Sequence, residues 1–449
     1  MLGPADYGRY SFITKFIGFF MIVAYFGLRW VVVREISADR TLARAYLRIG
    51  LRIRTITTLT AIVACCTIGF LLHLDHSVKL GIAIFSVSLA VGGIGELLEG
   101  VLLALGRSYC IAGANVTASL LKFVVGTWAL YAGHGLFGVL AVFVAATMVS
   151  TGLDILFVKS ALRGEDQRAE EPGLTKLVLR ESLPFVVQAG AARLYQKNDI
   201  IFLTMLRGNE ATGIYSAAYV FLDLLMAVAS SVVAAVYPMV AKMQTESAHS
   251  VSEAYGRLHK YMLLGLLPIS AALMFLGPSI LVTVFGKAYV RGNLPLQILV
   301  WTLPVEVSCL VSGTFLCAMY QQRLTAIITI CTASLNVVAT VGLIMLYSAT
   351  GAAVATVGGS LVSAVIHYVY VRRVVGPIST LDAWLKPLAC GGLMLSAMCC
   401  IPISMTIIRV IAGILVYVAA LAAVRPIDAE DRRLMLSLLK RNANKVAAR

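Results

Sequence analysis

The sequence predicts an all-α protein that crosses a membrane many times. Of its 449 residues, 59% are hydrophobic and only 13% are charged, and the mean hydropathy is +0.88. Soluble domains contain about 45–50% apolar and about 25% charged residues. The apolar residues fall in runs of roughly 20, the length that an α-helix needs to cross a hydrocarbon layer of about 30 Å. The composition therefore excludes a soluble enzyme, a disordered chain and a secreted disulfide scaffold.

Thirteen apolar runs are long enough to be candidate membrane spans. Segments that carry most of the charged residues separate many of these runs, and Pro402 separates the last two. In chain order, the predicted spans are residues 11–33, 55–74, 80–104, 109–131, 136–158, 183–206, 214–240, 258–277, 294–318, 324–347, 350–371, 384–402 and 405–424.

Lysine and arginine are distributed unevenly between the two sets of alternating loops. One set, which includes residues 34–54 and the tail 425–449, holds 26 of the 37 basic residues, and the other set holds 5. Such a bias places the basic loops in the cytoplasm. The net charge of +15 is therefore an orientation signal rather than a nucleic-acid patch, and the C-terminus is predicted to be cytoplasmic. We expect no nucleic-acid partner.

The nine cysteines all fall within apolar runs, and none forms a CxxC pair. Buried cysteines in such positions behave as small hydrophobic residues. The histidines near the outer span ends show no metal-ligand spacing, and no Gly-rich phosphate loop occurs in the cytoplasmic segments. We expect neither a metal site nor a cofactor.

An odd number of spans with a cytoplasmic tail places Met1 on the outer side of the membrane. No signal peptide is recognisable before the first span. We therefore expect that a first helix is missing from the chain as written, although outward insertion of a short N-terminus would give the same topology.

The two halves of the sequence contain a repeat. With an offset of 205 residues, the segment around Gly8 and Tyr10 matches the segment around Gly213 and Tyr215, and both precede spans predicted to run from outside to inside. The halves are therefore predicted to be parallel repeats, forming two helical bundles around a central cavity. The predicted division is an N-terminal bundle 1–160, a cytoplasmic linker 161–182, a C-terminal bundle 183–375, an extra helix pair 376–424 and a basic tail 425–449.

Several motifs resemble the polysaccharide and O-antigen flippases of the multidrug/oligosaccharidyl-lipid/polysaccharide exporter superfamily. They are "LGPADYGRYS" (2–11), "VVVREI" (31–36), "KNDIIFLTMLRGNEATGIYSAAY" (197–219), "VVAAVYPMVAK" (232–242) and "VFGKAY" (284–289). The resemblance covers about residues 2–375 and is specific only in combination.

This resemblance implies a two-bundle transporter of twelve or fourteen spans. It implies the flipping of an undecaprenyl-pyrophosphate-linked oligosaccharide from the cytoplasmic to the outer leaflet of a bacterial inner membrane. It also suggests glycan polymerase and export machinery as partners, and H⁺ or Na⁺ coupling. Members usually have a helix before the "LGPxDYG" segment, which agrees with the expectation that a first helix is missing from the chain as written.

Four basic residues in the predicted spans are candidate contacts for the anionic pyrophosphate. Arg193 and Lys197 share one helix face, and Lys122 shares a polar stripe with Asn115 and Ser119. Such residues lie too deep to reach the interface easily and would suit a buried dianion. Arg29 is either an entry contact or a positive-inside anchor. Two further span cations, Lys15 and Arg409, are expected to extend towards the membrane interface instead.

Six acidic residues also fall in the spans, and intramembrane acids are candidates for ion coupling or gating. Asp223 and Glu306 either couple transport to H⁺ or Na⁺ or form salt bridges with the candidate cations. Asp199 is a candidate gate. The remaining three, Glu96, Glu99 and Asp154, either contribute to coupling or neutralise cations such as Arg107 and Lys159.

Two other functions remain possible on sequence alone. One is the cation-coupled export of small molecules by the same superfamily. The other is a membrane-embedded glycan polymerase or ligase, which is disfavoured because the longest outer loop (278–293) contains no acid and no histidine. We therefore expect a transporter rather than an enzyme.

Overall fold

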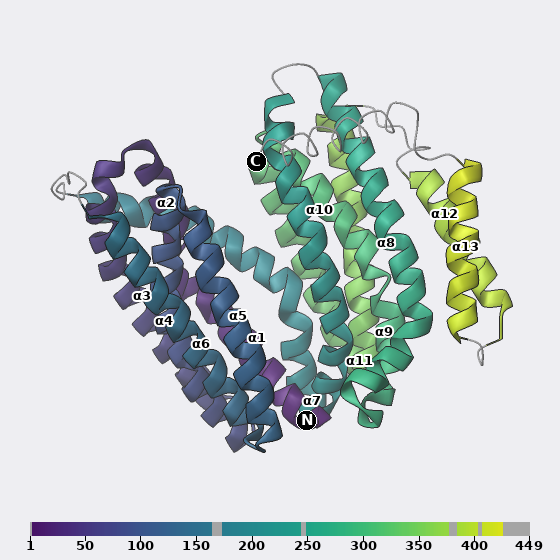
Figure 1. Ribbon diagram of the computed structural model, residues 1–449, viewed down its shortest axis with the longest axis horizontal. Helices are drawn as coiled ribbons and strands as arrows, with labels where there is room; N and C mark the ends of the chain where they lie inside the picture. Colours follow the sequence, from purple (N-terminus) through teal and green to yellow (C-terminus); the bar gives the residue numbers. More distant parts are fainter. Residues whose placement is uncertain (1, 164–172, 244–247, 377–383, 403–405, 425–449) are drawn as a thin grey trace, which may run out of the picture. The chain divides into compact units, whose positions relative to one another are not determined.

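The computed structural model describes residues 2–163, 173–243, 248–376, 384–402 and 406–424, and within these ranges the elements are helical (Figure 1). The all-α prediction is confirmed. The elements in order are α1 (Pro4–Tyr25), α2 (Leu28–Ala38), η1 (Arg40–Leu42), α3 (Ala43–Leu71), α4 (His76–Ala104), α5 (Ser108–Tyr131), α6 (Gly135–Ala161), α7 (Leu174–Met243), α8 (Ala248–Phe285), η2 (Lys287–Gly292), α9 (Asn293–Leu299), α10 (Thr302–Ala318), α11 (Gln322–Val374), α12 (Lys386–Cys400) and α13 (Thr406–Val424).

The chain forms two compact units. Unit 1 contains Met1–Ala217 and Thr329–Ala352, and unit 2 contains Ala218–Ile328 and Ala353–Arg449. Unit 1 therefore includes the start of the second sequence repeat. The bundle boundaries predicted from the sequence remain a prediction, and the predicted tail 425–449 lies outside the described residues.

Unit 1 is built around α4, which packs against α1, α2, α3 and α6 (Figure 1). One apolar cluster surrounds Phe12, Phe16 and Leu140, and another surrounds Val32, Leu97 and Val158. The outward faces of these helices also carry large apolar side chains, as expected for helices surrounded by lipid.

Unit 2 packs α8 against α10 and α12, with α12 also packing on α13. Its largest apolar cluster surrounds Tyr255, Val311 and Phe315. Beside this cluster, side chains including Trp301, Tyr368 and Trp384 line a cavity of about 590 Å³, and the lining is almost entirely apolar.

Eight helices in the described part of the chain are long and apolar enough to cross a membrane, and the number is ten if each of two bent pairs forms one span. The bent pairs are α1 with α2 and η2–α9 with α10, with bends of 41° and 44°. The predicted total of thirteen is larger for two reasons. Helices α7 and α11 each contain two predicted spans, and α12 has only 15 residues.

Both long helices contain a residue with a left-handed backbone between their two predicted spans. In α7 this residue is Gly208, with φ of 82°. In α11 it is Ser348, with φ of 55° and ψ of −132°. A Cβ at Gly351 would lie 1.9 Å from the carbonyl oxygen of Leu343, so the chain folds back on itself around Ser348. Each long helix is therefore two helices joined without a loop.

Gly8 and Gly213, which are equivalent in the sequence repeat, meet in unit 1. A Cβ on Gly8 would lie 1.8 Å from the Asn209 carbonyl oxygen, and a Cβ on Gly213 would lie 1.8 Å from the Pro4 carbonyl oxygen. Because real Cβ atoms do not approach this closely, glycine is required on both sides. The side chain of Asn209 also donates to Asp75 Oδ2, at 2.8 Å.

Candidate functional site

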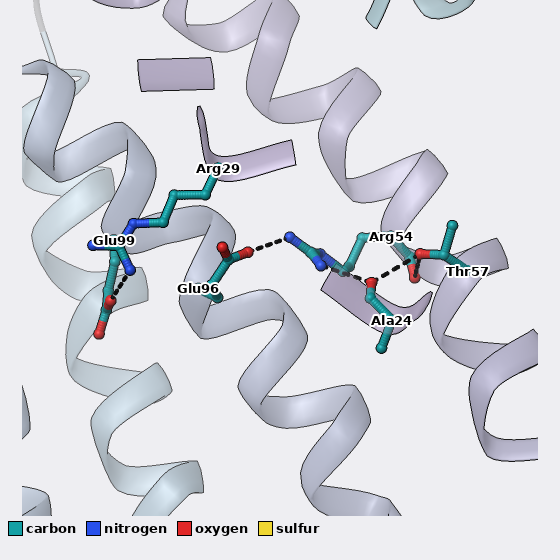
Figure 2. A network of polar contacts seen from close by, with 6 residues as sticks. All are labelled: Ala24, Arg29, Arg54, Thr57, Glu96 and Glu99. Atoms are coloured by element: carbon teal, nitrogen blue, oxygen red, sulfur yellow. Dashed lines mark hydrogen bonds and ion pairs between the residues drawn. The ribbon is translucent and has the colours of Figure 1, made fainter. Parts of the chain in front are cut away.

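Two ion pairs, one of them with a fully buried arginine, lie beside the break between α1 and α2 (Figure 2). Arg54 of α3 is only 1% exposed, and its Nη2 donates to Glu96 Oε2 of α4 at 2.5 Å. Its guanidinium also lies 5.3 Å from the ring centroid of Tyr25. A buried arginine with a carboxylate and an aromatic partner retains its charge without exposure to water.

Arg54 also donates a hydrogen bond to a backbone carbonyl at the end of α1. Helix α1 stops because Phe26 and Gly27 adopt positive φ values, 48° and 65°. The Ala24 carbonyl oxygen accepts from Arg54 Nη1 at 2.7 Å and from Thr57 Oγ1 at 3.0 Å. In a membrane, unsatisfied backbone groups are costly, and side chains of neighbouring helices commonly replace the lost hydrogen bonds. Arg54 therefore stabilises the break between the two helices.

Arg29, in the first turn of α2, forms the second ion pair in Figure 2. Its Nη1 donates to Glu99 Oε2 at 2.9 Å, and the two side chains are 26% and 17% exposed. The other oxygen of Glu99 accepts from Asn115 Nδ2 at 3.1 Å. Unlike Arg54, Arg29 is partly exposed.

Glu96 and Glu99 therefore do pair with cations, but with Arg54 and Arg29 rather than with Arg107 or Lys159. Arg54 was missed because it ends a run of basic residues that the sequence places in a cytoplasmic loop. The spacing of buried positions along α3 would have identified Arg54 as a packed residue. Buried positions recur at Tyr46, Gly50, Ile53, Arg54 and Thr58, so Arg54 falls on the packed stripe of the helix.

Two further predicted cations of unit 1 are partly buried. The Nη2 atom of Arg193 lies 3.4 Å from the position that a Cβ on Gly18 would take, so its guanidinium packs on α1. The Nζ atom of Lys122 lies 5.3 Å from the ring centroid of Phe143. The side chain of Lys197 is outside the described side chains.

Asp154 lies on the packed face of α6. The residue is 1% exposed, and its Oδ1 atom has no hydrogen-bond partner among the described residues. The predicted neutralisation by Arg107 or Lys159 is not observed there.

Asp199 belongs to a buried polar cluster in α7. Its Oδ2 accepts from the Tyr215 hydroxyl at 2.5 Å, and its Oδ1 accepts from the backbone N–H of Ile200. The adjacent Asn198 donates to Asn336 Oδ1 of α11 at 3.2 Å. Carboxylate, amide and hydroxyl oxygens are the ligands that hard cations prefer. Within the described residues, however, no group of three His, Cys, Asp or Glu could hold a metal ion.

The last two predicted acids have different surroundings. Asp223 has an exposed side chain on α7. Glu306 lies in the first turns of α10, and its Oε1 accepts from Ser360 Oγ at 3.5 Å. Arg409 is 7% exposed, donates to the Ile401 carbonyl oxygen and packs on Phe275. Ile401 is the C-cap residue of α12, and the expected extension of Arg409 towards the interface stays a prediction.

A comparison with protein families identifies the first half of the chain. The model for polysaccharide biosynthesis proteins matches residues 1–244, more than half of the sequence. This chain is a member of the polysaccharide biosynthesis protein family. The resemblance inferred from the sequence motifs is confirmed at this level. A comparison with curated protein sequences gave no match.

Solved structures share the fold of this family member. Lipid II flippase MurJ, in its inward closed conformation, is 12% identical, with a TM-score of 0.71 over 92% of this chain and 97% of that one. An inward-facing multidrug resistance MATE transporter of the MOP superfamily is 18% identical, with a TM-score of 0.68 over 83% and 91% of the two chains. A MOP superfamily transporter from Pyrococcus furiosus is 17% identical, with a TM-score of 0.60 over 83% and 87%. At these identities the likeness shows that the chain shares the fold of these three proteins.

Proposed function

We propose that this protein flips a polyprenyl-pyrophosphate-linked oligosaccharide from the cytoplasmic to the outer leaflet of a bacterial plasma membrane. The substrate would supply O-antigen, capsule or exopolysaccharide synthesis, and transport would proceed by alternating access. The family match and the fold shared with a lipid II flippase support a lipid-linked substrate. Polymerase and export machinery are the expected partners, and the C-terminus is expected in the cytoplasm.

The observation that carries this proposal is the set of accessible cations in unit 1. Arg29 and Arg193 are partly buried guanidinium groups, and Lys122 adds a third positive charge. A guanidinium presents a planar fork of donors that matches phosphate oxygens, and such charge-assisted hydrogen bonds strengthen as water is excluded. The pyrophosphate would displace Glu99 from Arg29, exchanging one anion for another.

Unit 2 by itself contains an apolar cavity that could hold a lipid chain. Its volume of about 590 Å³ and its apolar lining fit a segment of hydrocarbon chain rather than a sugar. An isoprenoid chain is apolar and could occupy such a site, whereas a small polar metabolite would find almost no polar partner there. This favours a lipid-linked substrate over the small-molecule exporter that the MATE fold would also allow.

The test is a flipping assay with the purified full-length protein in proteoliposomes. The probe is a fluorescent undecaprenyl-pyrophosphate-linked disaccharide, and the label in the outer leaflet is reduced chemically at intervals. We expect that all of the fluorescent label is reduced in vesicles that contain the protein. In empty vesicles, we expect that about half of the label is reduced. Protection of half the probe in both preparations would overturn the proposal.

Two controls separate the alternatives. A fluorescent cationic drug accumulated under the same conditions would favour a multidrug exporter. Complementation of a flippase-deficient strain tests the function in cells. Lipid-linked sugar that remains on the cytoplasmic side, despite expression in the membrane, would contradict a role in that pathway.

A further inference from the structure

The acids of unit 1 differ in the partners that the structure gives them. Glu96 and Glu99 accept hydrogen bonds from arginines, and Asp199 accepts one from Tyr215. Asp154 is more deeply buried than Glu96 or Glu99, yet its Oδ1 has no hydrogen-bond partner among the described residues. It also takes part in none of the ion pairs described above.

The local packing leaves little to stabilise a charge at this position. Asp154 lies three residues after Thr151 and four before Val158, on the face of α6 that packs against α4. The Thr151 hydroxyl donates to the Val91 carbonyl oxygen at 3.1 Å, so its hydrogen is already used. Val158 belongs to an apolar cluster with Leu97.

An ionised carboxylate in such a place is costly. The transfer of an unpaired charge into an apolar interior costs far more free energy than the transfer of a neutral acid. Binding of a proton converts the carboxylate into this neutral acid. Even the insertion scales that give the smallest penalties make a charged aspartate within a membrane span unfavourable. The neutral, protonated acid is therefore the form that this packing accommodates.

The charged and titratable groups on the packed elements reinforce this conclusion. Glu96 and Glu99 lie on α4, and Lys159 follows on α6 itself. Glu99 is paired with Arg29 and accepts from Asn115, and Glu96 is paired with Arg54. On α5, Cys110 is buried and Lys122 lies against Phe143.

We propose that Asp154 binds the proton that couples transport in this protein. The proton adds to a carboxylate oxygen from water on one side of the membrane and dissociates to water on the other. Helix α4, which packs against α6, also carries Glu99, the partner of the candidate substrate contact Arg29. The inference rests on the proposed function and names its coupling ion.

The first test measures how lipid distributes between leaflets under an imposed pH gradient. The same proteoliposome assay is used, with the membrane potential clamped by potassium and valinomycin. For one proton per lipid, a gradient of one pH unit shifts the leaflet ratio of the fluorescent lipid about tenfold. We expect this shift in the wild type and none in Asp154→Asn, which still exchanges lipid without a gradient. Glu253→Gln, which changes an acid whose side chain is 52% exposed, is the matched control and retains the shift.

The second test detects the proton without transport. Infrared difference spectra between high and low pH report the C=O stretch of a protonated carboxylic acid, and Asp154→Asn removes one such band. A full pH-driven shift in Asp154→Asn, an unchanged infrared spectrum, or a shift driven by sodium instead would each overturn the assignment. A wild type that flips no lipid would refute the proposed function, while the infrared band would still test the proton site.

Discussion

The backbones of Gly8 and Gly213 lie in direct contact, with each glycine facing the carbonyl oxygen of the residue that begins the other helix segment. The partner oxygens belong to Pro4 and Asn209, and each would lie 1.8 Å from an added Cβ. The sequence offset of 205 relates Gly8 to Gly213, and it also relates Pro4 to Asn209. The contact is thus symmetric in sequence as well as in geometry.

Gly8→Ala and Gly213→Ala are each expected to destabilise the protein by at least about 1–3 kcal/mol, because a methyl group must displace backbone atoms. Thermal unfolding in detergent measures the loss. Gly113→Ala and Gly152→Ala are matched helical controls with no heavy atom within 4 Å of the new Cβ. These controls should be neutral or stabilising by up to about 1 kcal/mol. Equal melting temperatures in all four variants would contradict the contact.

Arg54→Met is expected to cost about 3–5 kcal/mol, because it leaves Glu96 charged and buried and the Ala24 carbonyl with one donor fewer. The double variant Arg54→Met/Glu96→Leu should lose less than the sum of its single variants. Denaturation in a mild detergent provides the comparison.

An exposed ion pair in unit 2 serves as the control. Arg257 and Glu253 are 3.7 Å apart, with side chains 31% and 52% exposed. Breaking this pair should cost less than about 1 kcal/mol. Similar losses for the two pairs would show that Arg54 is not a structural element of the helix break.

Arg29→Ala and Arg193→Ala are expected to slow the flipping of the fluorescent lipid by about tenfold or more. A lost hydrogen bond to a charged group costs about 1.5–3 kcal/mol, which exceeds the 1.4 kcal/mol of a tenfold change. Arg29→Lys should recover part of the rate, since it restores the charge without the planar fork. Arg257→Ala is the control for the loss of a surface cation. Wild-type rates in both alanine variants would remove these residues from the substrate path.

Ser348→Gly is expected to stabilise unit 1 slightly, and Ser348→Val to destabilise it by about 1–3 kcal/mol. At φ of 55° and ψ of −132°, the serine has a backbone conformation that only glycine adopts readily. Arg207 supports the same turn by donating to the carbonyl oxygens of Ile344 and Met345. Unfolding midpoints of the two variants should therefore move in opposite directions.

Hydropathy and the repeat predicted much of this fold. Apolar runs locate helices well, because every backbone group in a membrane must find an internal partner and only a helix supplies these within one segment. The same argument cannot predict the joints at Gly208 and Ser348. Their tight reversals depend on the approach of two helices, such as that of Leu343 to Gly351, and not on local composition.

The candidate site was less predictable. Span charges such as Arg29 and Glu99 are visible in the sequence, but their pairing joins residues 70 positions apart. Arg54 escaped notice because a basic residue at the end of a polar loop and one on a packed stripe look alike in a hydropathy scan. The isolation of Asp154 could not be predicted either, because the absence of a partner is visible only once all neighbouring helices are in place.

The symmetric glycine contact has a consequence for the origin of the chain. A patch that meets its own copy across a two-fold axis is the isologous interface of a homodimer. If the two repeats arose by duplication, the ancestral half-length protein would already have held two identical subunits together through this one glycine. After fusion, a substitution of Gly8 or of Gly213 would clash with the unchanged backbone of the other repeat. The two copies could therefore diverge in sequence at other positions but not at these glycines.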